Sequence, residues 1–167
     1  MLADQNGVIE LSSLNRGDNY FRLAANEAER RAIAERIGEP GVETLTGDFT
    51  LTPFKGGVAL SLHVTAKVNR LCVASLEPIV EAVNETYSIR FEREFDDRGA
   101  DDPEDDYSRE PLEGDTLDLG EILVQHLALS LVPHPRKEGT ESLVERYRDP
   151  ANLSPFAALK GVVDGDA

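Results

Sequence analysis

The sequence predicts a domain of the α+β class: a curved antiparallel β-sheet, open or barrel-like, with a C-terminal amphipathic helix packed on it and an N-terminal helix at its edge. Between residues 42 and 95, apolar and polar side chains alternate, which is the period of half-buried strands. Residues 119–131 instead carry apolar side chains three and four positions apart, as on one face of an α-helix. A helix of this length is marginal in water alone, so it needs the sheet as a docking surface.

The N-terminal forty residues predict two short strands followed by a helix. The β-prone pieces are residues 8–14 and 20–23, separated by the turn-forming run NRGDN. Asn26 offers an N-cap with Glu29 three residues later, and Gly38 ends the helical pattern. Because its apolar face is thin and its other side carries Glu and Arg, this helix should lie on the surface.

The strongest strand signal follows a predicted hairpin turn at Gly56-Gly57. Six alternate positions are apolar: Val58, Leu60, Leu62, Val64, Ala66 and Val68. Further strands are expected up to Phe95. Their pairing should be antiparallel, because the connections are short and no crossover helix intervenes.

The second helix begins after Asp118, which can cap it, while Glu121 three residues later completes a capping-box pattern. Five residues form its apolar stripe: Leu119, Ile122, Leu123, Leu127 and Leu131. Pro133 and Pro135 end the helix. The tail NLSPFAALK contains a short apolar cluster, residues 156–159, that could dock on the core or on a partner.

The chain is acidic, and most of the acidity lies in one segment. It has 17 Lys and Arg against 32 Asp and Glu, a net charge of −15. Residues 92–115 alone contain 12 acids and three bases. Within one domain spanning 1–167, we therefore expect a mobile acidic loop at 96–114. Such charge repels polyphosphate, so the sequence favours a basic partner, or RNA bound through a small basic patch, and no DNA.

The sequence also predicts a compartment. Cys72 is the single cysteine, so no internal disulfide can form and a reduced cytoplasmic location is expected. No apolar run approaches the roughly 18 residues that cross a bilayer. The N-terminal run MLADQNGVIELSS is unlike a signal peptide, having acids where bases would stand. We expect a cytoplasmic protein without membrane contact.

Few residues suggest catalysis or metal binding. The histidines, His63, His126 and His134, lack the paired spacing of a zinc site, so no metal is expected. Cys72 could be a nucleophile only with an oriented base, and its surroundings fit a buried small side chain better. The run DDPEDD lacks the spacing of a calcium loop, and no nucleotide-binding fingerprint occurs. We expect no cofactor and no enzymatic activity.

A small basic patch is the clearest candidate for binding. His134 lies in a Pro-His-Pro turn beside Arg136 and Lys137, where an imidazole could contact an RNA base or phosphate. Lys67 and Arg70 complete the candidate patch. The alternative is a helix-ending loop whose cations interact with the negative end of the helix dipole.

Two segments resemble a known family. The run LCVASLEP at 71–78, followed by DTLDLGEILVQHLALSLVPHPRKEG at 115–139, resembles the YceD family of large ribosomal RNA subunit accumulation proteins, in its alphaproteobacterial form. The run ANEAERRAIAERIG, the acidic segment and the closing PFAALK occur in the same order as in that family. The matching positions are Cys72, Leu76, Glu77, Pro78, Asp118, Leu119, Gly120, Glu121, Leu127, Pro133 and Pro135, with His134 where relatives often have Tyr or His.

The resemblance implies a small bacterial protein needed for normal levels of large-subunit ribosomal RNA. Many members carry a second cysteine three positions after the first, but Ser75 stands there in this chain. The cysteine pair that a metal or redox role would use is therefore absent. We therefore expect a non-enzymatic ribosome biogenesis factor that binds ribosomal RNA, a basic large-subunit ribosomal protein, or both. The alternatives are a small hydrolase or RNA-modifying enzyme using His63, Cys72 or His134, and a protein–protein adaptor.

Overall fold

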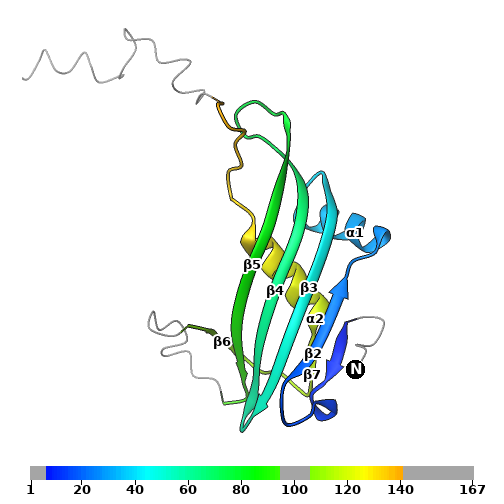
Figure 1. The fold of residues 1–167 in the computed structure, drawn as a ribbon, viewed down its shortest axis with the longest axis vertical. Helices are drawn as coiled ribbons and strands as arrows, with labels where there is room; N and C mark the ends of the chain where they lie inside the picture. Colours follow the sequence, from blue (N-terminus) through cyan, green and yellow to red (C-terminus); the bar gives the residue numbers. More distant parts are fainter. Residues whose placement is uncertain (1–6, 95–105, 141–167) are drawn as a thin grey trace, which may run out of the picture.

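The computed structural model describes residues 7–94 and 106–140 (Figure 1). In chain order the elements are β1 (Val8–Glu10), the 3-10 helix η1 (Leu11–Ser13), β2 (Asn19–Ala24), α1 (Glu27–Ile37), β3 (Gly41–Phe54), β4 (Gly57–Leu71), β5 (Pro78–Glu92), β6 (Ser108–Pro111), β7 (Thr116–Asp118) and α2 (Leu119–Ser130). Five strands form one sheet in the order β2-β3-β4-β5-β6, and β1 pairs with β7 in a second, two-stranded sheet. The predicted α+β class is confirmed. The main sheet is open rather than barrel-like.

The long strands β3, β4 and β5 build the sheet, and α2 crosses behind them in Figure 1. The predicted alternation in β4 is confirmed, since all six apolar positions from Val58 to Val68 are buried. The hairpin turn is shifted by one residue from its predicted place. Phe54 pairs with Gly57, so Lys55 and Gly56 form the turn, and the positive φ of Gly56 (98°) supplies its backbone conformation.

The apolar stripe of α2 lies against the sheet as predicted. Leu119, Ile122, Leu123 and Leu127 are buried. Gly47 of β3 makes this approach possible, because a Cβ there would lie 2.8 Å from Cδ1 of Leu123. The core therefore lies between the sheet and α2. The helix α1 packs against β3, near the edge of the sheet that β2 forms.

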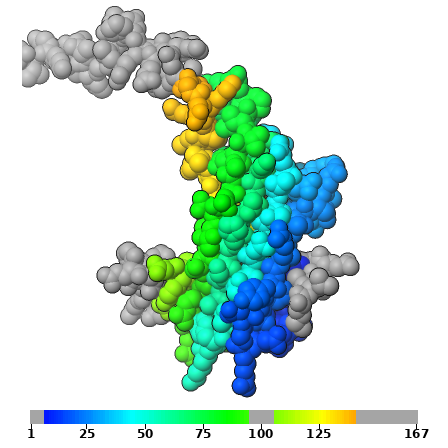
Figure 2. Space-filling model, in the orientation of Figure 1, coloured from blue at the N-terminus to red at the C-terminus, as the bar shows by residue number. Residues whose placement is uncertain are grey.

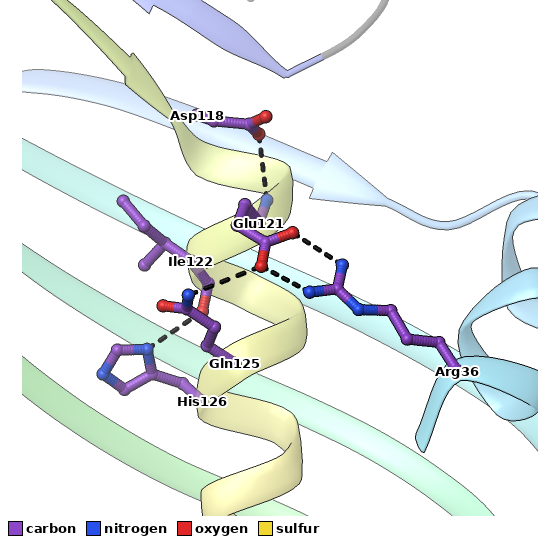
Figure 3. Close-up of polar contacts among 6 residues, drawn as sticks. All are labelled: Arg36, Asp118, Glu121, Ile122, Gln125 and His126. Carbon is purple, nitrogen blue, oxygen red and sulfur yellow. Dashed lines mark hydrogen bonds and ion pairs between the residues drawn. The ribbon is translucent and has the colours of Figure 1, made fainter. Parts of the chain in front are cut away.

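The N-termini of the two helices differ from each other. The Asn26 side chain accepts from the Glu29 backbone, and the Glu29 carboxylate accepts from the Asn26 backbone, so the predicted capping box is complete. Asp118 also accepts from the Glu121 backbone N–H, at 2.9 Å. The Glu121 carboxylate, however, does not return to Asp118. It accepts two hydrogen bonds from Arg36 of α1, at 2.6 and 2.5 Å, and so links the two helices (Figure 3).

Three strands depart from the predictions. Pro78–Glu92 form one long strand, β5, rather than several. Residues 108–111 lie within the segment predicted to be a loop, yet they form β6, which pairs with β5 in parallel. The strands predicted between residues 42 and 95 pair antiparallel as expected, and this unpredicted strand adds a parallel pair at the edge of the sheet. Residues 116–118 form β7, which pairs with the N-terminal β1.

Two predictions lie outside the described residues, namely most of the acidic segment (95–105) and the apolar tail cluster at 156–159. The mobility of the acidic segment stays a prediction. Among the described residues, neither helix has the length and apolar character that spanning a membrane requires.

Candidate functional site

Most candidate residues meet at one end of the main sheet, which we call the β4–β5 end. It comprises residues 70–81, where β4 turns into β5, and residues 131–138, which follow α2. The Val73 N–H donates to the Pro135 carbonyl at 2.9 Å, so the two segments lie in contact. Figure 2 shows them side by side at the narrow end of the molecule, where the second segment is orange.

Arg70 lies in the interior of this end, not on its surface. Its side chain is only 8% exposed and forms ion pairs with Glu39, at 2.8 Å, and with Glu81, at 2.5 Å. It also donates to the Val132 carbonyl at 2.6 Å. Burial by itself would lower the pKa of the guanidinium, but the hydrogen bonds to Glu39 and Glu81 more than offset it, so the pKa is raised.

The structure therefore corrects the assignment of Arg70 to an RNA-binding patch. Its two terminal nitrogens contact protein groups, and its Nε is buried without a hydrogen-bond partner among the described residues, so the guanidinium is not free to bind a phosphate. Its role is to join α1's C-terminal loop, β4, β5 and the end of α2 through Glu39, Glu81 and Val132. Glu39 and Glu81 were not among the predicted site residues.

Cys72 is fully buried directly after β4. Its sulfur accepts a hydrogen bond from the Lys137 N–H, at 3.4 Å. The Ser75 hydroxyl lowers the pKa of the Cys72 thiol most, followed by the backbone N–H groups of Lys137, Ser75 and Ala74, and together they bring it to about 6 against the effect of burial. Cys72 is therefore buried as expected, but in a polar cage of donors that favour its thiolate.

The other residues of the predicted patch are exposed. His134 and Arg136 face solvent, and the Lys137 ammonium pairs with Glu77 at 3.1 Å. Hydrogen bonds from Lys137 and then Ser75 hold the pKa of the Glu77 carboxyl below its ordinary value. Lys67 is exposed on the opposite side of β4 from the buried positions, on the sheet face that α2 leaves open. The structure thus groups His134, Arg136 and Lys137, while Lys67 lies on the other face.

The histidines and the cysteine form no connected cluster. His63 lies on the open sheet face, where its Nδ1 is 3.0 Å from the Thr86 hydroxyl. His126 is buried in α2, with its ring against Tyr87 at a centroid distance of 4.5 Å. No hydrogen bond in the described part of the chain joins His63, Cys72 and His134 to one another. Within residues 7–94 and 106–140, no group of three or more His, Cys, Asp and Glu is arranged to hold a metal ion.

The β4–β5 end also exposes five large apolar side chains. Leu76 is 72% exposed and has a positive φ of 59°, which is costly for a bulky side chain. Other large apolar side chains exposed at this end are Leu71, Val73, Val80 and Val132. A strained, exposed leucine amid such side chains is typical of a contact surface.

A family model described as "Large ribosomal RNA subunit accumulation protein YceD" matches residues 60–161, well over half of the chain. The chain belongs to the YceD family. No curated protein and no solved structure matches the chain significantly. The YceD match begins in β4 and includes β5, α2 and both segments of the β4–β5 end. The two runs that carry the resemblance, 71–78 and 115–139, are thus brought together in space by the contact between Val73 and Pro135.

The Cys72 cage makes a prediction about pH. The thiol should titrate with a midpoint near 6 rather than at its ordinary 9.0, and Ser75→Ala should raise that midpoint because it removes the hydroxyl donor. Since the pKa is lower in the folded chain, the thiolate contributes stability that is fully present above pH 9.0 and lost as the pH falls to about 6. Thiolate absorbance of the wild-type chain and of Ser75→Ala measures the midpoint. Urea unfolding of the wild-type chain and of Cys72→Ser across this pH range measures the stability.

Ser12→Ala is the matched control for Ser75→Ala, because Ser12 is exposed and lies in η1. It should leave the thiol midpoint unchanged. A Cys72→Ser stability loss that is the same at both ends of the range would contradict a cage that selects the thiolate.

Proposed function

We propose that this chain is a non-enzymatic factor in the biogenesis of the large ribosomal subunit, which supports the accumulation of large-subunit ribosomal RNA. The YceD match over residues 60–161 carries this proposal. It acts by binding, either to a basic large-subunit ribosomal protein or to ribosomal RNA itself, in a cytoplasmic bacterial setting.

The charge distribution supports binding of a basic component. The net charge is −15, and residues 92–115 hold 12 of the 32 acids. Both described bases of this segment, Arg93 and Arg109, are engaged in ion pairs with Asp115 and Glu92. The segment therefore keeps a surplus of carboxylates to attract a cationic protein.

Direct contact with RNA would use the exposed cations of the β4–β5 end. Arg136 and Lys137 lie beside His134, and Lys67 offers a further charge on the open sheet face. Arg70 is left out of this group because its guanidinium is buried between carboxylates.

Depletion of the protein in its host is the first test. We expect the ratio of large-subunit to small-subunit ribosomal RNA to fall, and the wild-type chain to restore it. Complementation with Lys67→Ala/Arg136→Ala/Lys137→Ala then tests the RNA route, because loss of phosphate contacts would leave the ratio low and reduce the salt dependence of RNA binding. An unchanged ratio on depletion would overturn the proposed function, in favour of an adaptor or an enzyme acting elsewhere.

A further inference from the structure

The edge of β5 is open along most of its length. On one side, β5 pairs with β4 from Pro78 to Glu92. On the other side, β6 pairs only with residues 89–92. Among the described residues, no strand pairs with residues 78–88 on that side, and Figure 1 shows β6 beside only one end of β5. At about 3.3 Å per residue, this leaves roughly 36 Å of unpaired strand edge.

Several of the usual protections of an edge strand are missing from residues 82–88, although Glu81, just before them, points inward to Arg70. Natural sheets guard long edges with lysine, proline, bulges or short strands. Apart from Pro78 at its start, the stretch from 79 to 88 contains neither proline nor lysine, and its pairing with β4 runs without a bulge. Such an edge is a template for another strand, and strand addition is a common mode of peptide recognition.

Apolar surface lies directly beside this edge. A groove of about 560 Å³ separates residues 79–81 from residues 132–138. Val80 and Val132 on its walls are each more than half exposed. Leu129 of α2 is 74% exposed and lies one turn beyond His126, whose ring contacts Tyr87 of β5, so it projects on the β5 side. An added strand would cover these apolar side chains.

The charges along the edge select a basic occupant. Glu85 is exposed and makes no ion pair with any described residue, whereas Glu81 is committed to Arg70. In the sequence, the acidic segment 92–115 begins at the last residue of β5. A second copy of this chain fits poorly, since full antiparallel overlap of the two open edges would set Glu85 opposite Glu81 of that copy.

We propose that residues 82–88 of β5 bind an extended segment of a protein partner as an additional strand, and that this segment carries Lys or Arg opposite Glu85, on the α2 face, and apolar residues on its other face, beside Val80. This deepens the proposed function by naming the kind of partner: a large-subunit ribosomal protein with a basic, extended segment. Main-chain hydrogen bonds would supply affinity, and the carboxylates would supply selectivity.

Peptide binding to the full chain tests the proposal independently of ribosomal RNA levels. The probe is a ten-residue peptide in which Lys and Arg alternate with Val, compared with the same peptide carrying Glu in place of each cation and with a version methylated at alternate backbone nitrogens. We expect the cationic peptide to bind and the other two not to. In the complex, amide hydrogen exchange should slow at alternate residues of 82–88.

Charge reversal at Glu85 supplies a matched pair of variants. Glu85→Lys should weaken binding of the cationic peptide about fivefold, because it sets like charges opposite each other. Glu43→Lys changes the net charge equally at an exposed position of β3, which β4 separates from β5, and should have little effect. Equal effects of the two variants, or undiminished binding of the methylated peptide, would overturn strand addition.

Two other outcomes would also overturn it. Concentration-dependent dimerisation that Glu85→Lys alters would assign the edge to a second copy. Peptide binding that occurs only after removal of residues 141–167 would assign the edge to the chain's own C-terminal segment. Loss of the ribosomal RNA phenotype without loss of peptide binding would instead reject the proposed function alone.

Discussion

Arg70→Ala is expected to lower the free energy of unfolding by about 3–5 kcal/mol. The substitution removes the cation that Glu39 and Glu81 share, and it leaves two nearly buried carboxylates without their ion pairs. The Val132 carbonyl loses its donor as well. Both glutamate side chains retain 16% exposure, so water softens the penalty toward the lower end of this range. Urea unfolding followed by far-ultraviolet circular dichroism measures it.

Two variants separate this effect from general charge loss. Lys67→Ala removes an exposed cation from the same strand and should change stability by no more than about 0.5 kcal/mol. Adding Glu39→Gln and Glu81→Gln to Arg70→Met should recover most of the lost stability, because no charge then remains buried. Equal unfolding midpoints for Arg70→Ala and Lys67→Ala would mean that Arg70 is a surface residue after all.

Arg70 lies on the face where the alternation of β4 places it. The buried residues of β4 occupy even positions from Val58 to Val68, and Arg70 continues that series. Strand alternation alone would therefore have placed it on the core face. Glu81 is likewise on the same face of β5 as Val83, and such a pair of opposite charges on one buried face is the available signal for a buried ion pair.

Local sequence patterns predicted the structural elements that depend on residues close together in the chain. The capping box at Asn26, the alternation in β4 and the apolar stripe of α2 are all set within a few residues, and all are confirmed. Contacts across the chain were not predictable in this way. Glu121 had a suitable local partner in the Asp118 backbone, yet it binds Arg36, 85 residues away, because the fold brings α1 beside α2 (Figure 3).

The candidate site also divides into local features that the sequence predicted and long-range contacts that it did not. The sequence identified the two runs that form the β4–β5 end, but not that Val73 and Pro135 join them or that Cys72 lies among donors. The free edge of β5 was equally hidden. It results from β6 being short and parallel, and a segment of high charge and little apolar content gives no period from which to predict a four-residue strand.

Gly57→Ala is expected to destabilise the chain by about 3 kcal/mol, at the upper end of the usual range for overpacking. A Cβ on Gly57 would overlap the Phe91 carbonyl oxygen of β5. No side-chain rotation can relieve a clash with backbone, so β4 and β5 would have to separate where Gly57 pairs with Glu92. The hydrogen bond from the Arg93 N–H to Gly56, at 2.9 Å, would be strained too.

Gly17→Ala is the matched control, because a Cβ there meets no atom within 4 Å. It should be neutral or stabilise the chain by about 0.4–1 kcal/mol through the unfolded state. Equal unfolding midpoints for the two variants would mean that β4 and β5 do not approach as closely at this end, and that the pairing of Gly57 with Glu92 is wrong. Because β6 pairs with residues 89–92 of β5, the C-terminal limit of the free β5 edge lies at the end of the strand that this experiment tests. The experiment on Gly57 therefore tests the frame on which the proposed strand addition rests.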